Sequence, residues 1–241
     1  MRSDQQVFRR KEVKYLLPSR QYEGMLHLLR DHIVPDSFFE SDILSLYFDT
    51  PDFLLIRRSL EKPDYKEKLR LRCYGLPDAD SPAFLEIKKK CAGIVYKRRE
   101  ALPYEQALYY LQGAELGRDS QIFREMDWML QFYGTLQPAM LLTCHRLSYR
   151  AKDSSGVRIT FDRDMMWRSQ ALDLRAGIWG NALFPSGHQL MELKLPGAMP
   201  LWLSHSLARL RIYPRSVSKY GLAYQALQAQ VAGKEEVRRY A

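Results

Sequence analysis

Apolar and polar side chains alternate along most of the middle of the chain. Between residues 66 and 74, for example, basic residues separate Leu69, Leu71 and Cys73. Because successive side chains of a β-strand point to opposite faces, this pattern predicts strands with one buried and one polar face. The strands predicted in this way cover residues 7–17, 44–48, 66–74, 83–90, 94–100, 139–150, 157–163 and 188–195.

Helices are predicted where apolar residues recur every three or four positions, as Tyr22, Met25, Leu26 and Leu29 do. The predicted helices cover residues 18–32, 51–60, 103–112, 120–132, 199–210 and 216–231. Segments rich in Pro, Gly, Ser and Asp separate these elements and predict turns at residues 76–82, 152–156 and 184–187. Strands and helices do not alternate regularly, so the chain is expected to form one antiparallel α+β domain over residues 1–241 rather than a parallel sheet.

The composition excludes several classes of protein. Hydrophobic residues make up 46% and charged residues 27%, which excludes a wholly disordered chain. Cys73, Cys91 and Cys144 are scattered, so neither a disulfide framework nor a zinc ribbon is expected, and a reducing, cytoplasmic setting fits best. No apolar run is long enough to span a bilayer, and the polar N-terminus does not resemble a secretory signal. The 37 Lys and Arg against 28 Asp and Glu give a net charge of +9, which favours an anionic partner.

The predicted strands place most of these cations on shared faces. Side chains two positions apart share one face of a strand and lie about 7 Å from one another. Two like charges at that separation cost roughly 2 kcal/mol at an effective dielectric constant of 20, so several such pairs favour a bound polyanion over a merely solvated face. The residues that this alternation groups together are Arg10, Glu12 and Lys14; Lys66, Lys68, Arg70 and Arg72; Glu86, Lys88 and Lys90; Lys97 and Arg99; Arg146, Ser148 and Arg150; Arg158, Thr160 and Asp162; and Glu192 and Lys194.

Three acidic residues on these faces are candidate metal ligands. Glu12, Glu86 and Glu192 offer hard oxygen atoms, which suit Mg²⁺ or Mn²⁺. A divalent ion that bridges carboxylates and phosphate oxygens is the usual arrangement for phosphoryl transfer. The alternative is that each carboxylate pairs with a neighbouring Lys or Arg.

An ordered set of short motifs resembles the VTC domain, the polyphosphate polymerase domain of the vacuolar transporter chaperone complex, which belongs to the triphosphate tunnel metalloenzymes (CYTH-like superfamily). The motifs are Glu12-Val13-Lys14, Tyr47-Phe48-Asp49, Lys68-Leu69-Arg70-Leu71-Arg72, Phe84-Leu85-Glu86-Ile87-Lys88, Val157-Arg158-Ile159-Thr160-Phe161-Asp162, Met191-Glu192-Leu193-Lys194 and Ser218-Lys219-Tyr220-Gly221. The resemblance implies an antiparallel β-barrel tunnel with helices packed outside and a C-terminal helix at one end. It also implies transfer of the terminal phosphate of ATP, or of another triphosphate, onto polyphosphate with Mn²⁺ or Mg²⁺.

The resemblance also implies roles for particular residues. Those expected to bind phosphate are Lys14, Lys68, Arg70, Arg72, Lys88, Lys97, Arg146, Arg158, Lys194, Ser218 and Lys219, with Arg98 or Arg99 as alternatives to Lys97. The catalytic set is expected to be Arg70, Arg72, Lys88, Arg158 and Glu192, with Glu192 as the metal ligand and Glu12 and Glu86 as further candidates.

One departure from the superfamily bears on the reaction. Triphosphatases of this superfamily usually open with E-x-E-x-K, whereas this chain has Arg10 in the first acidic position. One acid fewer favours transfer or binding over hydrolysis. A triphosphatase, or a non-catalytic polyphosphate-binding module of a membrane assembly, remains the alternative, while a nucleic-acid partner is not expected. A membrane protein partner would place the chain at a membrane.

Overall fold

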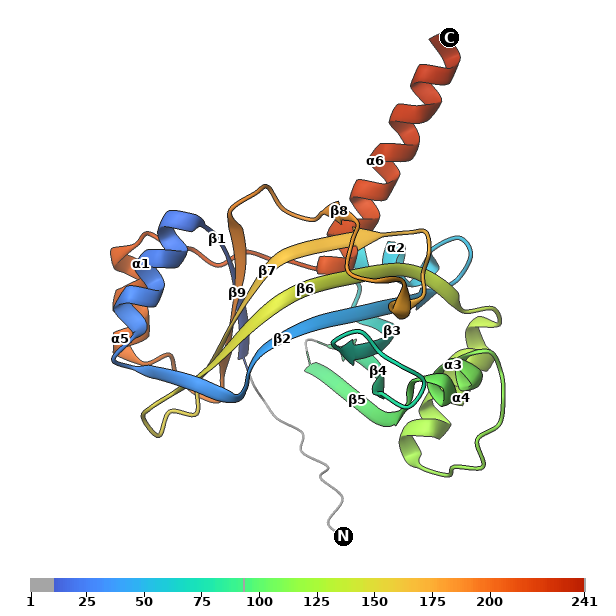
Figure 1. Cartoon of the computed structure of the whole chain (residues 1–241), viewed down its shortest axis with the longest axis horizontal. Helices are drawn as coiled ribbons and strands as arrows, with labels where there is room; N and C mark the ends of the chain where they lie inside the picture. Colours follow the sequence, from blue (N-terminus) through green and yellow to red (C-terminus); the bar gives the residue numbers. More distant parts are fainter. Residues whose placement is uncertain (1–10, 93, 241) are drawn as a thin grey trace. The chain divides into compact units, whose positions relative to one another are not determined.

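The computed structural model describes residues 11–92 and 94–240, which form an antiparallel sheet with helices packed on it (Figure 1). The strands are β1 (Lys11–Pro18), β2 (Ile33–Asp49), β3 (Tyr65–Tyr74), β4 (Pro82–Cys91), β5 (Ile94–Pro103), β6 (Gln137–Ala151), β7 (Arg158–Arg168), β8 (Asn181–Ala182) and β9 (His188–Leu195). The helices are α1 (Ser19–Leu29), α2 (Leu54–Leu60), α3 (Tyr104–Leu111), α4 (Gln121–Tyr133), the 3₁₀ turn η1 (Leu174–Ala176), α5 (Leu201–Arg209) and α6 (Lys219–Tyr240).

The strands pair in the order β1-β9-β7-β6-β2-β3-β4-β5, with β8 paired to β7. A closed barrel was expected, but in the described part of the chain this order is an open path with β1 at one end and β5 at the other. The edge of β1 is covered by another segment of the chain. The backbone N–H of Arg215 donates to the carbonyl oxygen of Lys14 at 2.8 Å, and the Lys14 ammonium donates to the carbonyl oxygen of Val217 at 3.1 Å. The first of these bonds occupies a backbone carbonyl that a further strand would need.

The chain divides into two compact units, which are described separately. Unit 1 comprises residues 1–42, 144–165 and 184–217, and unit 2 comprises residues 43–143, 166–183 and 218–241. The long strands β2, β6 and β7 contribute residues to both.

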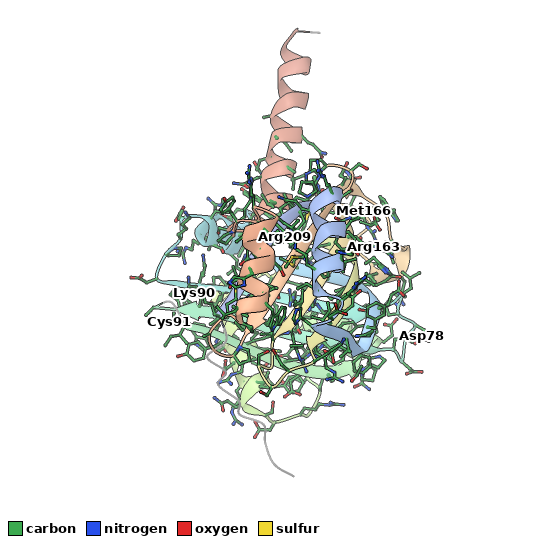
Figure 2. All side chains as sticks on the ribbon, turned by 90° about the vertical axis from the view of Figure 1, so that its left-hand side faces the viewer. Asp78, Lys90, Cys91, Arg163, Met166 and Arg209 are labelled. Carbon is green, nitrogen blue, oxygen red and sulfur yellow. The ribbon has the colours of Figure 1, made fainter. Side chains whose placement is uncertain are left out.

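Unit 1 buries the apolar faces of its strands beneath two helices. Tyr15 and Leu17 of β1, together with Ile159 of β7 and Leu193 of β9, belong to one buried cluster. Helices α1 and α5 contact each other and lie side by side over this cluster (Figures 1 and 2). The opposite faces of the same strands are thereby left to the polar residues that alternate with the apolar ones.

Unit 2 has a core on each face of its sheet. Alternate residues of β2, β3 and β4, such as Leu46, Leu71 and Leu85, form the larger cluster with residues of α3 and α4. On the opposite face, a smaller cluster joins Tyr47 of β2 to Tyr220 of α6 and to buried residues of α2, β6 and β7. The first turns of α6 take part in it, whereas residues 228–233 are exposed.

The predicted elements are confirmed with shifted ends, except around β2 and β8, while residues 7–10 of the first predicted strand lie outside the described residues. The strand predicted at 44–48 is the buried half of β2, which begins eleven residues earlier at Ile33. That first half does not alternate because Pro35, Asp36 and Ser37 interrupt it and few of its residues are buried. The short elements η1 and β8 were not predicted, because a two-residue strand carries no periodic signal.

Candidate anion-binding faces

The strand β3 presents alternating basic residues to one face of unit 2. Leu69, Leu71 and Cys73 are buried on one side, while the side chains of Lys68, Arg70 and Arg72 are partly exposed on the other. The charge alternation read from the sequence is therefore confirmed in this strand. Lys66 shares the basic side and its ammonium donates to the carbonyl oxygen of Ser59 at 3.0 Å.

The register of β3, β4 and β5 sets the predicted phosphate-binding residues next to one another. Lys68 pairs with Lys88, and Lys88 pairs in turn with Lys97. Two residues further along β3, Arg70 pairs with Glu86, and Glu86 pairs with Arg99. We refer to this group of side chains, Lys68, Arg70, Arg72, Glu86, Lys88, Lys97 and Arg99, as the basic face of unit 2.

A single buried carboxylate holds the centre of this basic face. The side chain of Glu86 is 1% exposed and contacts four cations. The distances from its carboxylate oxygens are 2.6 Å to Arg70 and 2.6 Å to Lys97, with Arg99 at 3.4 Å and Arg72 at 3.9 Å. Burial on its own raises the pKa of Glu86, but Arg70, Arg72 and Lys97 lower it by more, to about 2. Four positive groups around one negative group leave a net charge of +3 in this cluster, which is the charge that an anion would neutralise.

The start of helix α6 joins the same face. The Lys68 ammonium donates to the Ser218 hydroxyl at 3.0 Å, and this hydroxyl also accepts from the backbone N–H of Gly221 at 3.2 Å. Ser218 therefore caps the N-terminus of α6, because its hydroxyl accepts from a backbone N–H of the first turn. Lys219 is the first residue of α6. The structure thus brings Ser218, with Lys219 next to it in the chain, to the lysine-rich end of the basic face.

Unit 1 carries a second group of charged residues on β1 and β9. Lys14 pairs with Glu192 and Glu12 pairs with Lys194 across these strands. The Lys14 ammonium lies 3.4 Å from the carboxylate of Glu12 and 3.9 Å from that of Glu192, and Lys194 lies 3.5 Å from Glu192. Two basic and two acidic side chains therefore alternate across this strand pair.

The predicted arginines of unit 1 differ in their surroundings. Arg146 forms a two-pronged ion pair with the fully buried Asp162, at 2.5 and 2.7 Å. Burial lowers the pKa of Arg146, but Asp162 outweighs that effect and raises it above its ordinary value. Arg158 is exposed at the start of β7, with Asp36 at 3.7 Å. Arg158 is therefore more accessible to a ligand than Arg146, whose head group is already engaged.

The three acidic residues predicted as metal ligands differ in how well their surroundings suit a metal ion. In the described part of the chain, no three His, Cys, Asp or Glu side chains converge on one point. Glu12 and Glu192 contact the same ammonium group, and such a pair of carboxylates suits a hard divalent cation. Glu86 is surrounded by four cations instead, which is the alternative that the sequence left open. Arg10, which replaces the first acid of the superfamily motif, lies outside the described residues.

Two residues of these faces were not among the site residues expected from the sequence. The hydroxyl of Tyr47 accepts from Arg70 at 3.0 Å, and Asp162 is the partner of Arg146. Alternation does place Tyr47 opposite the buried Leu46 and Phe48, but its position beside Arg70 depends on the register of β2 and β3. That register is not visible in the sequence.

Comparison with known proteins decides the family. The family model described as the VTC domain matches residues 9–228. The chain belongs to the VTC domain family. Subunit 4 of the vacuolar transporter chaperone complex of Trypanosoma brucei brucei is 25% identical, and the match covers 66% of this chain. The chain covers 26% of the length of that relative.

Solved structures show the same fold. A candidate adenylate cyclase from Bacillus halodurans has a TM-score of 0.52 at 16% identity, and the match covers 86% of this chain and 92% of that one. A candidate adenylyl cyclase from Hippeastrum with a dominant triphosphatase activity has a TM-score of 0.50 at 14% identity, covering 89% and 95%. The VTC domain chain therefore has the fold of triphosphate tunnel (CYTH-like) proteins, as its motifs predicted. None of its described helices combines the length and apolar character needed to cross a membrane.

Proposed function

We propose that this VTC domain is a phosphotransferase that lengthens polyphosphate with the terminal phosphate of ATP or another nucleoside triphosphate. The basic face of unit 2 carries this proposal. Four of its cations converge on the carboxylate of Glu86, and this cluster has a net charge of +3, whereas a purely structural ion-pair network would have balanced its charges. Membership of the VTC domain family supports polyphosphate as the anion.

The proposed roles follow from the chemistry of each side chain. Arg70 and Arg72 have planar guanidinium groups, which bind two phosphate oxygens at once. Lys68, Lys88 and Lys97 are compact charges in adjacent strands and neutralise successive phosphates of a chain. The bond between the terminal phosphorus and its bridging oxygen breaks, and the nucleoside diphosphate leaves. A terminal oxygen of polyphosphate forms the new bond, so no covalent protein intermediate is needed.

The residues of unit 1 are proposed to bind phosphate and a metal ion. Glu192 and Glu12 would hold Mn²⁺ or Mg²⁺, which supplies positive charge to the reacting phosphate when it is bound. Lys14, Lys194, Arg146 and Arg158 would contribute further positive charge toward phosphate, and Arg158 is the most open of the arginines considered in this unit. Glu86 is proposed to orient the cations of unit 2 rather than to bind metal.

The setting of the domain is part of the proposal. The trypanosomal relative is by name a subunit of a complex, and this chain covers 26% of it. We propose that a membrane protein partner receives the product and places this cytoplasmic domain at the membrane surface.

A product analysis with labelled ATP tests the proposed function. Purified protein, ATP labelled at the terminal phosphate and Mn²⁺ are incubated, and long polyphosphate is separated from free phosphate. Long labelled chains support the polymerase. Free phosphate alone would make the protein a triphosphatase, and tight polyphosphate binding without turnover would make it a binding module.

Two variants show whether any product depends on the basic face. Arg70→Ala is expected to abolish chain synthesis, and Arg70→Lys to restore only a small part of it, because a lysine keeps the charge without the planar fork. Arg124 is an exposed arginine on α4 and provides the matched control, so Arg124→Ala should synthesise chains at the normal rate. Normal synthesis by Arg70→Ala would contradict the assignment.

A further inference from the structure

An uncharged side chain lies among the cations of unit 2. Tyr47 of β2 is directly opposite Arg70 of β3 in the strand register. The Arg70 NH1 group donates to the Tyr47 hydroxyl oxygen at 3.0 Å, and the guanidinium carbon lies 5.8 Å from the centre of the Tyr47 ring. The motif Tyr47-Phe48-Asp49 has no role in the function proposed above, so this contact calls for an explanation.

Tyr47 and Glu86 hold Arg70 from two directions. Nε and NH2 of Arg70 both lie 2.6 Å from the same carboxylate oxygen of Glu86, while NH1 donates to Tyr47. An arginine has five N–H groups, and these contacts use one on each of its three nitrogens. The two that remain belong to NH1 and NH2, the pair that forms a two-pronged bond with a phosphate.

The ring of Tyr47 is itself fixed by helix α6. Tyr47 stacks on Tyr220 with 4.5 Å between ring centres and an angle of 21°. The hydroxyl of Tyr220 donates to a carboxylate oxygen of Asp49 at 2.8 Å. The same carboxylate accepts from three backbone N–H groups, those of Thr50, Leu55 and Ile56. The start of α2, the first turn of α6 and Tyr47 therefore form one connected arrangement.

Close packing keeps α6 in this position. A Cβ atom on Gly221 would lie 2.9 Å from a methyl carbon of Leu60 and 3.2 Å from Ser218, so a larger residue at this position would force the Leu60 side chain to shift. Tyr220 itself is 2% exposed. Movement of the first turn of α6 would consequently move the surface on which Tyr47 rests.

The charges that lower the pKa of Tyr47 come from the basic face. Burial alone raises the pKa of Tyr47, but Arg70, Arg72 and Lys68 lower it by more, to about 8. The buried cluster to which Tyr47 and Tyr220 belong also contains the apolar Ile56 of α2, Met140 and Leu142 of β6, and Trp167 of β7, with the phenol of Tyr224 partly buried against it. The phenol therefore responds to the positive charge of the basic face and to any anion that neutralises it.

We propose that Tyr47 is a positioning residue, whose hydroxyl holds Arg70 with two N–H groups turned toward a bound phosphate and whose ring ties this arrangement to the first turn of α6. The inference rests on the proposed function, because it needs a phosphate on the basic face. It adds that anion binding and the hydroxyl proton of Tyr47 are coupled. An anion that neutralises the surrounding cations makes the proton harder to remove, and loss of the proton weakens anion binding by the same factor.

Two measurements on the full chain test this inference, with inorganic triphosphate as the probe. The ultraviolet absorbance of tyrosinate is titrated from neutral pH toward the ordinary tyrosine pKa of about 10, with and without triphosphate. Calorimetry gives the affinity for triphosphate over the same range. The variants are Tyr47→Phe, which keeps the ring and loses the hydroxyl, and Tyr109→Phe as the control, because Tyr109 is an exposed tyrosine on α3.

In the wild type and in Tyr109→Phe, one tyrosine is expected to ionise with a pKa of about 8, and triphosphate should raise that pKa. The affinity of both proteins should fall above that pH, by about tenfold for each unit by which triphosphate raises the pKa. Tyr47→Phe should lack the early ionisation and this fall in affinity. At neutral pH it should bind triphosphate about threefold to tenfold more weakly, the loss typical of one hydrogen bond.

The possible failures can be told apart. If the wild type does not bind triphosphate, the proposed function is wrong and the role of Tyr47 is wrong with it. If the wild type binds triphosphate and Tyr47→Phe has the same affinity and the same pH dependence, the positioning role alone is overturned. A variant that loses only thermal stability, with an unchanged pH dependence, would also overturn it, because a merely structural tyrosine predicts that result.

Discussion

Removing the charge of Glu86 is expected to destabilise the domain in the absence of an anion. The substitution Glu86→Gln keeps the size of the side chain and leaves Arg70, Arg72, Lys97 and Arg99 without their shared negative partner. Burial raises the pKa of Glu86, but the nearby cations lower it to about 2 from an ordinary value of 4.5. At about 1.4 kcal/mol per pKa unit, the ionised form contributes about 3 kcal/mol to the free energy of unfolding. In a domain of this size, such a loss lowers the melting temperature by about 6–12 °C.

The effect has a defined dependence on pH. A carboxyl whose folded pKa is depressed contributes its full stability above the unfolded pKa and loses it as the pH falls through the folded pKa. The difference between wild type and Glu86→Gln should therefore be complete at neutral pH and shrink between pH values of about 4.5 and about 2. Urea unfolding followed by circular dichroism at several pH values measures this difference.

Triphosphate should partly restore the variant, because an added polyanion replaces the missing negative charge. Its stabilising effect is expected to be larger in Glu86→Gln than in the wild type. Glu105→Gln removes an exposed carboxylate that also has an arginine partner, Arg175, and it should change the free energy of unfolding by less than about 1 kcal/mol. If Glu86→Gln were as stable as the wild type at neutral pH without an anion, the account of the basic face would be refuted.

Three further substitutions probe unit 1. Arg158→Ala should abolish chain synthesis in the labelled-ATP assay with little change in melting temperature. The control Arg209→Ala, on the exposed side of α5, should be fully active. Normal synthesis by Arg158→Ala would remove Arg158 from the site. Glu192→Ala should lose the dependence of turnover on Mn²⁺ while retaining triphosphate binding by calorimetry, and an unchanged metal dependence would reject this ligand. Asp162→Asn leaves the buried charge of Arg146 without its ion-pair partner, so the free energy of unfolding measured in urea should fall by about 3 kcal/mol. An unchanged unfolding midpoint would contradict the structural role of this ion pair.

Local periodicity was sufficient to predict the strands that carry the charged faces. The alternation of Leu69 and Leu71 with Arg70 and Arg72 appears in the structure as one buried and one partly exposed side of β3. The first half of β2 was not predicted, because few of its residues are buried and nothing there imposes an alternating pattern.

The partners within each face depend on register, which a single strand does not encode. Glu86 was considered as a metal ligand because its carboxylate offers hard oxygen atoms on a charged strand face, yet the pairing of β3, β4 and β5 surrounds it with four cations. In the same way, the stacking of Tyr47 on Tyr220 joins residues that are far apart in the chain. Such contacts follow from tertiary packing and leave only a shared face as a signal in the sequence.

The most direct test of the central claim is a crystal structure of the chain with inorganic triphosphate. The basic face of unit 2 is expected to hold the anion, with phosphate oxygens within hydrogen-bonding distance of NH1 and NH2 of Arg70 and of the Arg72 guanidinium. Glu86 should remain beneath them, still paired with Arg70 and Lys97. A triphosphate bound elsewhere, with this cluster of cations left in contact with solvent alone, would contradict the account.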